Sequence, residues 1–236
     1  MTVIFAYHVN LVKFVRHKYK SMTNMKKVIL MLVCVFSTIS VAAQTKMSWN
    51  MQLGLGVSTW MGKDANGAKG LFNPKVGVGI DIPLTNLISF QSGLSWVSKG
   101  ASYDASVDIL GIPGDLDMKV NQNYFQMPLL AAFHLGTGSS FDLVLKAGGY
   151  LAYGVCGKSE IEYDDITVGW DTFGDSKVKD VELPGLHRFD AGIVTGIDFD
   201  FPTWFVGCEG EFGLCKVADG ASPHNFAFFV NVGYKF

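Results

Sequence analysis

The sequence has little charge and few cysteines. Only 17% of its 236 residues are Asp, Glu, Lys or Arg, whereas soluble proteins average about 25%. Four cysteines are too few for a disulfide scaffold. The lack of a Gly-X-Y period and the 49% of hydrophobic residues exclude collagen-like and disordered chains. A formal net charge of −2 argues against a nucleic-acid partner. What is abundant is glycine, with 27 residues, and phenylalanine, with 18.

Residues 25–43 have the order of a secretory signal. Met25–Lys27 form a basic start, Val28–Phe36 form a short apolar run, and Val41–Ala43 place small residues at a cleavage position. The apolar run is shorter than the roughly 20 residues that a transmembrane helix needs. We therefore interpret this segment as a cleavable signal peptide rather than a membrane anchor.

The signal divides the chain into two predicted segments. Residues 1–43 hold an N-terminal extension and the signal peptide, and residues 44–236 form the mature domain. Residues 1–24 are either a long basic extension of the signal or a stretch that precedes the true start at Met25. The first segment holds basic residues and no acidic ones, so its removal leaves an acidic exported domain.

The mature domain alternates between apolar and polar residues with a period of two. Over Trp49–Val57 the odd positions are apolar and the even positions are Asn, Gln or Gly. No long segment shows the helical period of 3.6 residues. Each alternating segment has about the 9–11 residues that a tilted strand needs to cross a bilayer. Seven further segments alternate in the same way, namely residues 75–82, 88–96, 122–135, 141–153, 188–199, 204–214 and 225–236.

The connections between these eight predicted strands are alternately long and short. Such a layout is typical of outer-membrane barrels, with long connections outside the cell and tight turns in the periplasm. The sequence therefore predicts an all-β fold, an eight-stranded antiparallel up-and-down transmembrane β-barrel with both termini on the periplasmic side. The longer connections are residues 62–70, 98–117, 156–183 and 216–224, and the short ones are residues 83–86, 136–139 and 200–203.

Two features predict which face of the barrel looks outward. The polar face carries mainly small residues and few long charges, whereas a soluble exterior needs many Lys and Glu. Aromatic residues lie near the strand ends, as in the girdles of membrane barrels. The alternative is a soluble lipocalin-type barrel with its apolar face inward. The aromatic residues in question are Trp49, Trp60, Trp96, Phe133, Phe141, Tyr153, Phe199, Trp204, Phe226 and Phe236.

Three segments carry a resemblance to a known family. Asn123–Leu130, which reads Asn-Tyr-Phe-Gln-Met-Pro-Leu-Leu, resembles a strand of the PorT-like outer-membrane β-barrel family of the Bacteroidetes type. Arg188–Gly196 is similar to that family's Gly-rich sixth strand. The ending Asn231–Phe236 resembles the aromatic-terminated signal, here Tyr234 and Phe236, that barrel-assembly machinery reads. The resemblance implies the fold and an address in the outer membrane of a Gram-negative bacterium, and little chemistry.

Charged residues on the polar face are predicted to meet inside the barrel. An eight-stranded barrel leaves no aqueous channel, and charges in a narrow interior must pair. We interpret them as an ion-pair network that plugs the lumen, with Lys146 and Arg188 facing Glu209 or Glu211. A gated ion path is the alternative. The predicted network consists of Lys75, Asp81, Lys146, Arg188, Asp190, Glu209 and Glu211.

The connection over residues 159–183 is strongly acidic. Its carboxylates suit Ca²⁺ or Mg²⁺, but the Asp-x-Asp-x-Asp-Gly spacing is missing, so we expect a solvated loop that is open to an external partner. Cys156 and Cys215 both lie at the predicted external rim. The sequence leaves open whether they pair, while Cys208 is expected to face lipid.

Catalytic chemistry has little support in the sequence. No Gly-x-Ser-x-Gly or other nucleophile motif is present, and nothing points to a cofactor or a metal. We therefore expect a non-enzymatic barrel with a structural or surface-interaction role through its external loops, with membrane lipid and the assembly machinery as partners. The alternatives are a small-solute or ion channel and, less favoured, a lipid-modifying enzyme that uses His187 or His224.

Overall fold

The computed structural model describes residues 47–63, 65–109, 112–136, 140–163, 166–178, 181–183, 185–218 and 222–236. The predicted signal peptide in residues 1–43 lies outside the described residues, so its removal stays a prediction. Among the described residues, no helix is long and apolar enough to cross a bilayer.

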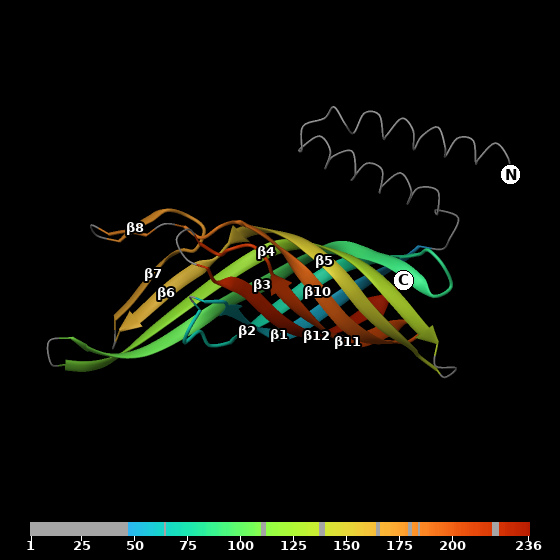
Figure 1. The fold of residues 1–236 in the computed structure, drawn as a ribbon, viewed down its shortest axis with the longest axis horizontal. Coiled ribbons are helices and arrows are strands. Elements are labelled where there is room, and N and C mark those ends of the chain that lie inside the picture. Colours follow the sequence, from blue (N-terminus) through green and yellow to red (C-terminus); the bar gives the residue numbers. More distant parts are fainter. Residues whose placement is uncertain are drawn as a thin grey trace, which may run out of the picture. The chain divides into compact units, whose positions relative to one another are not determined.

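Eight strands close into a hydrogen-bonded ring (Figure 1). The strands lie in the order β3-β2-β1-β12-β11-β10-β5-β4, every neighbouring pair is antiparallel, and β4 pairs back to β3. This closure confirms the predicted barrel, and it leaves none of these strands with an unpaired backbone edge in the lipid. The strands are β1 (Ser48–Met61), β2 (Leu71–Pro83), β3 (Ile88–Ile109), β4 (Ile112–Gly136), β5 (Asp142–Cys156), β10 (Phe189–Asp200), β11 (Trp204–Gly213) and β12 (His224–Lys235).

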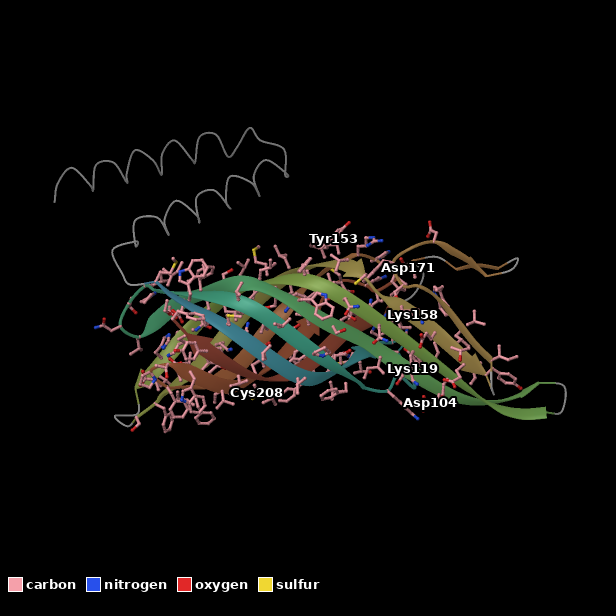
Figure 2. The ribbon with its side chains drawn as sticks, turned by 180° about the vertical axis from the view of Figure 1, so that it is seen from behind. Asp104, Lys119, Tyr153, Lys158, Asp171 and Cys208 are labelled. Atoms are coloured by element: carbon pink, nitrogen blue, oxygen red, sulfur yellow. The ribbon has the colours of Figure 1, made fainter. Side chains whose placement is uncertain are left out.

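The apolar face of the barrel looks outward. Along β1, Leu53 and Leu55 are 61% and 57% exposed, whereas the alternating Gly54 and Gly56 are buried. In Figure 2 the side chains of Tyr153 and Cys208 likewise lie on the outside of the barrel. This arrangement is the reverse of a soluble barrel, so the lipocalin-type alternative is wrong. One aromatic residue departs from the predicted girdle: Trp60 turns inward and donates from Nε1 to Gln122 Oε1 at 3.2 Å.

The tight turns and the C-terminus lie at one end of the barrel (Figure 1). The turn after β2 is closed by the amides of Leu84 and Thr85, which both donate to the Ile88 carbonyl oxygen. The C-terminal Phe236 donates its amide to Trp49 O at 2.9 Å, which ties the two ends of the domain together. This is the periplasmic end of an outer-membrane barrel, and the long connections lie at the opposite, extracellular end.

At the extracellular end, β3 and β4 continue well past the other strands. They run for 22 and 25 residues and stay paired up to Ile109 and Ile112. The connection expected at residues 98–117 is therefore a long hairpin rather than a loop. The strands approach closely at Gly100, which has a φ of +151° and where a Cβ would lie 1.9 Å from the Val120 carbonyl oxygen. A glycine is needed there because a side chain would clash with the facing backbone.

A second hairpin extends this projection sideways. β6 (Lys158–Tyr163) pairs with the upper part of β4, and β7 (Ile166–Asp171) pairs with β6. A separate two-stranded hairpin, β8 (Ser176–Val178) and β9 (Val181–Leu183), follows in the chain. The connection expected to be a solvated loop is thus largely β-structure. We call residues 101–109, 112–121, 158–163 and 166–171 the extracellular sheet.

Candidate functional site

Two regions concentrate chemistry: the lumen of the barrel and the extracellular sheet. In the lumen, three lysines from β2, β3 and β5 meet four carboxylates from β10 and β11. All seven residues are buried, with relative exposures of 6% or less. We call this group the lumen charge cluster, and it consists of Lys75, Lys99, Lys146, Asp190, Asp198, Glu209 and Glu211.

Each lysine of the cluster is paired. Lys75 donates to Glu209 and, at 3.0 Å, to Glu211 Oε1. Lys146 lies 2.8 Å from Asp198 Oδ2 and 4.0 Å from Glu209 Oε2. Lys99 lies 2.8 Å from Glu211 Oε2. These contacts link both sides of the ring, because β2 and β3 are separated from β10 and β11 by β1 and β12.

Glycines on the lumen face make room for these long side chains. A Cβ at Gly196 would lie 3.2 Å from Lys146 Cε, and one at Gly54 would lie 3.2 Å from Lys75 Cβ. A Cβ at Gly207 would lie only 2.0 Å from Asp198 Oδ1. The lumen of an eight-stranded barrel is filled by side chains, so the small residues of one strand accommodate the large residues of the next.

Two tyrosines close the lumen on the extracellular side of the cluster. Tyr150 donates its hydroxyl to Asp190 Oδ2 at 2.9 Å, and its ring centroid lies 4.0 Å from Lys99 Nζ. Tyr124 lies beside them and is 1% exposed. The Asn225 amide adds a second donor to Asp190, at 3.1 Å. The aromatic rings and the paired charges together form a plug.

Fully ionised, the cluster carries one more negative than positive charge. A buried excess charge is costly in a membrane interior unless a proton or a further cation compensates it. Several buried oxygens also lack a hydrogen-bond partner among the described residues, including Asp198 Oδ1 and Gln126 Oε1. One donor of the cluster, Lys99 Nζ, likewise makes no hydrogen bond, although it lies 2.8 Å from Glu211 Oε2.

Below the plug the lumen is hollow. A cavity of about 370 Å³ is lined by residues from all eight barrel strands. Thr85 and Asn86 of a periplasmic turn belong to its wall, so it opens toward the periplasm. We call it the periplasmic cup. Lys75, Lys146 and Glu209 lie at its inner end, where the plug begins.

The other predicted network residues lie away from the cluster. Asp81 belongs to the wall of the cup, where it accepts from Gln91 Nε2 at 2.6 Å and lies 3.9 Å from His134 Nε2. Arg188 is half-buried at the extracellular rim and donates to Gly154 O at 3.0 Å. The expected pairing of Arg188 with Glu209 or Glu211 is therefore wrong, because Arg188 precedes β10 and its guanidinium reaches the backbone of β5 instead.

Lys99 lies beyond the strand that the alternation predicts, which ends at Trp96, although β3 continues to Ile109. The signal was present in the sequence, since Ser95, Val97 and Lys99 continue the lumen-facing phase of β3. Tyr234 and Phe236, predicted as part of an assembly signal, lie 55% and 70% exposed at the barrel's C-terminal strand, and their rings are 5.2 Å apart.

The histidines have local partners. Nδ1 of His187 faces Lys216 O at 3.1 Å, and Nδ1 of His224 faces Cys215 O at 3.0 Å. Ser89 Oγ and Asp81 Oδ2 both face His134 through the same nitrogen, Nε2. A catalytic triad uses opposite nitrogens of the imidazole for its serine and its acid. This group therefore lacks the geometry of a triad.

Neither metal coordination nor a disulfide is present in the part of the chain that the structure describes. No group of three or more His, Cys, Asp or Glu there could hold a metal ion. Cys156, Cys208 and Cys215 are free thiols, and Cys156 is exposed.

The extracellular sheet has one apolar and one charged face. Tyr103, Met118, Ile161 and Val168 stand opposite one another in a row across β3, β4, β6 and β7. This row continues the lumen-facing phase of the barrel, where β3 and β4 had polar residues. The strands therefore exchange their polarity where they leave the membrane.

The opposite face of the sheet is mainly acidic. Asp104, Asp117 and Glu162 stand in register on β3, β4 and β6. Asp104 pairs with Lys69, and Lys158 lies 2.6 Å from Glu160 Oε1. Figure 2 shows Asp104 and Lys158 on the part of the structure that continues past the barrel. The Lys158 ammonium holds the pKa of Glu160 below its ordinary value, first through the hydrogen bond and then through charge attraction.

Comparisons with solved structures give low sequence identities. The attachment invasion locus protein Ail of Yersinia pestis is 11% identical, with a TM-score of 0.41, over 81% of this chain and 100% of that chain. Neisserial surface protein A is 10% identical, with a TM-score of 0.39, over 81% and 100%. OprG from Pseudomonas aeruginosa is 14% identical, with a TM-score of 0.38, over 80% and 95%. No curated protein matches the chain.

The family described as "Outer membrane protein beta-barrel domain" matches residues 42–219, which is most of the chain. The match agrees with the closed ring of eight strands and with the apolar outer face. The chain belongs to the outer membrane protein beta-barrel domain family and is a small β-barrel protein of the bacterial outer membrane.

Proposed function

We propose that this barrel is a non-enzymatic surface-interaction protein that binds an extended strand of an external protein at the edge of its extracellular sheet. The observation that carries the proposal is β7. It is the last strand of the sheet and pairs only with β6 among the described residues. An edge strand offers unpaired N–H and C=O groups, which a partner strand can use.

The side chains of β7 leave this edge accessible. Ile166 is 67% exposed and Val168 is 37% exposed. Exposed apolar residues on an edge strand favour strand addition, because the partner covers apolar area as it forms backbone hydrogen bonds. The edge therefore offers a partner strand both backbone hydrogen bonds and exposed apolar side chains.

Charge specifies the partner further. The outer face of the sheet presents Asp117, Glu162 and Asp171, while the inner face presents Val168 and its apolar row. A complementary strand has apolar residues on one side and Lys or Arg on the other. A second copy of the sheet is disfavoured, since its own outer face is acidic and would be repelled.

The lumen supports a binding role rather than transport. Tyr124, Tyr150 and the paired lysines fill its extracellular half, and Lys99 and Glu211 are each 1% exposed. A barrel of this width holds no aqueous channel. We further propose that the chain is a PorT-like barrel, because Asn123–Leu130 resembles a strand of that family.

The binding proposal is tested with two designed peptides. One alternates Val and Lys over eight residues and the other alternates Val and Glu; both are labelled and titrated against the folded protein in detergent by fluorescence polarisation. We expect the Val-Lys peptide to bind, and Val168→Pro to abolish that binding because proline removes a backbone donor and disrupts the edge strand. Asp142→Asn at the periplasmic end is the matched control. Equal binding of both peptides, or full binding by the proline variant, would overturn the proposal.

The channel alternative is tested by current measurement. The purified protein is reconstituted in a planar lipid bilayer with 1 M KCl on both sides. We expect no discrete conductance steps, because the plug blocks the lumen. Conductance steps that occur only when the protein is present would establish a channel and overturn the non-conducting part of the proposal.

A further inference from the structure

We propose that the periplasmic cup binds a neutral saccharide against an aromatic ring and a row of polar side chains in its wall. This inference concerns the opposite end of the barrel from the extracellular sheet and does not depend on the proposed function. We call the residues that carry it the cup patch, and they are Asn50, Gln52, Asp200, Phe205 and Lys235.

Phe205 and Gln52 stand on either side of a glycine in the cup wall. Gly233 of β12 is in register with Phe205 of β11 and with Gln52 of β1. A Cβ at Gly233 would lie 2.2 Å from Phe205 Cε1, so the ring lies over this glycine. Neighbouring strands are about 4.8 Å apart, so the ring lies one strand away from the strand that carries Gln52. The aromatic ring and the amide are therefore adjacent in the wall of the cup.

A second amide and an ion pair continue the patch toward the mouth of the cup. Asn50 lies two residues before Gln52 on the same face of β1, in register with Lys235. The Lys235 ammonium donates to Asp200 Oδ1 at 2.7 Å, and Asp200 is in register with Phe205. Each member of the patch thus neighbours another along a strand or across a strand pair, which places all five within reach of one small ligand.

The polar side chains of the patch are accessible from the cup. Asn50 and Gln52 are half-buried, and the side chains of Lys235 and Asp200 are 21% and 20% exposed. All four belong to the lumen-facing wall, so their exposed surface faces the cup rather than lipid. The amides of Asn50 and Gln52 have no hydrogen-bond partner among the described residues. Each amide therefore offers a ligand both an acceptor and an NH₂ donor.

The charges of the cup disfavour an ion as the ligand. Three lysines and five carboxylates belong to its wall, so with His134 neutral the wall repels an anion. The half-buried carboxylates already have donors, since Asp200 accepts from Lys235 and Asp81 accepts from Gln91. No group of residues that could hold a metal ion is present in the part of the chain described by the structure.

A sugar matches the groups that remain. Its hydroxyl groups donate and accept hydrogen bonds, as the two free amides do, and its apolar C–H face packs against an aromatic ring. The volume of about 370 Å³ lies near the lower end of the range for small-molecule sites, about 300–1,000 Å³. The plug closes the inner end of the cup. A free sugar and the end of a periplasmic glycan chain present the same chemistry to it.

The test is saturation-transfer NMR on the full chain, purified folded from outer membranes in perdeuterated dodecylphosphocholine, a detergent without a sugar headgroup. The probes are methyl β-glucoside, N-acetylglucosamine, its β-1,4-linked disaccharide, cationic glucosamine, and cyclohexylmethanol, a ring with a single hydroxyl group. We expect the neutral sugars to bind and cyclohexylmethanol to bind roughly tenfold more weakly or less, because it lacks the further hydrogen bonds. Equal affinity for single sugars and the disaccharide would point to a free sugar, and tighter binding of the disaccharide would point to a glycan end.

Three variants locate the site. Asn50→Leu and Gln52→Met each remove one amide with little change in volume, and Phe205→Leu removes the aromatic ring. We expect roughly threefold to tenfold weaker binding of methyl β-glucoside for each variant, as for the loss of one hydrogen bond or one ring contact. Asn66→Leu, at an exposed position in the connection after β1, is the matched control and keeps full affinity. Each variant is first checked for its folded mobility in an unboiled gel sample.

Any of four results overturns the proposal. The first two are no measurable binding of a neutral sugar and equal affinity for cyclohexylmethanol and methyl β-glucoside. The others are binding of glucosamine without methyl β-glucoside and unchanged affinity in whichever of the three cup variants fold. None of these results bears on the binding of strands at β7, so the two proposals fail separately.

Discussion

Lys75 and Glu211 lie 136 residues apart in the sequence and meet at 3.0 Å inside the barrel, where both are almost fully buried. Their contact joins β2 to β11, which are not neighbours in the ring. Ion pairs of this kind hold opposite walls of the lumen together, in addition to the backbone ladders that close it.

Removal of Lys75 should destabilise the barrel strongly. Lys75→Met leaves Glu209 and Glu211 with less compensation in a buried site, and breaking a buried pair in this way costs about 3–5 kcal/mol. The measurement is urea unfolding in lipid vesicles, followed by the folded and unfolded gel bands. Lys69→Met, which breaks an exposed pair with Asp104, is the control and should change stability little. Similar losses in the two variants would contradict the buried role of Lys75.

A charge placed on the outer face of β1 should be costly. Leu53 lies in the middle of the strand and is 61% exposed. If that face contacts lipid, Leu53→Arg destabilises the barrel by about 2–4 kcal/mol, as for a charge near the bilayer midplane. Vesicle unfolding measures the loss, and Lys119→Arg on the exposed part of β4 provides a neutral comparison. If Leu53→Arg leaves the stability of the barrel unchanged, this face does not contact lipid.

The β6–β7 hairpin should lose order in acid. Lys158 and Glu160 pair on its outer face, and the pair lowers the pKa of Glu160 from the ordinary 4.5. A depressed carboxyl pKa stabilises the folded hairpin above the ordinary value, and this contribution is lost as pH falls through the folded value. The protection factors of the β6 and β7 amides, which are corrected for the pH dependence of intrinsic exchange, should therefore be unchanged between pH 7 and 6. They should fall only below about pH 4.5. Lys158→Met should remove this acid dependence; persistence in that variant would assign it to another group.

Cys156 should react with a maleimide reagent in folded protein without prior reduction. It is an exposed free thiol, whereas Cys208 and Cys215 are half-buried. Mass spectrometry after brief labelling should find the adduct on Cys156 first. Labelling that appears only after a reducing agent would reveal a disulfide instead.

The barrel could be predicted from the sequence because most wall residues follow one simple alternation. Leu53 and Gly54 illustrate it: a lipid-facing apolar side chain is followed by a small lumen residue. The alternation did not predict the extracellular sheet, because apolar residues there take the side that carries polar residues in the barrel. Tyr103 and Met118 face the same side as the polar lumen residues below them, so the upper parts of β3 and β4 read as a break in the pattern.

The cluster was harder to predict than the walls. Alternation assigned Lys75, Lys146, Glu209 and Glu211 to the lumen, but it carries no information on height along the barrel axis. Arg188 has the correct phase and still lies at the rim, where it bonds to Gly154 O. Pairing depends on strand tilt and register, which decide whether β2 reaches across to β11, and these are properties of the closed ring.

The continuity of β3 and β4 fixes the direction in which a bound molecule is held. Because the same two paired strands form the barrel wall and the extracellular sheet, the sheet has no hinge of irregular chain at its base. A partner strand added to β7 would run along β7 and hence at a set angle to the membrane plane. The protein would thus hold its partner in a single orientation relative to the cell surface, because no flexible segment connects the sheet to the barrel.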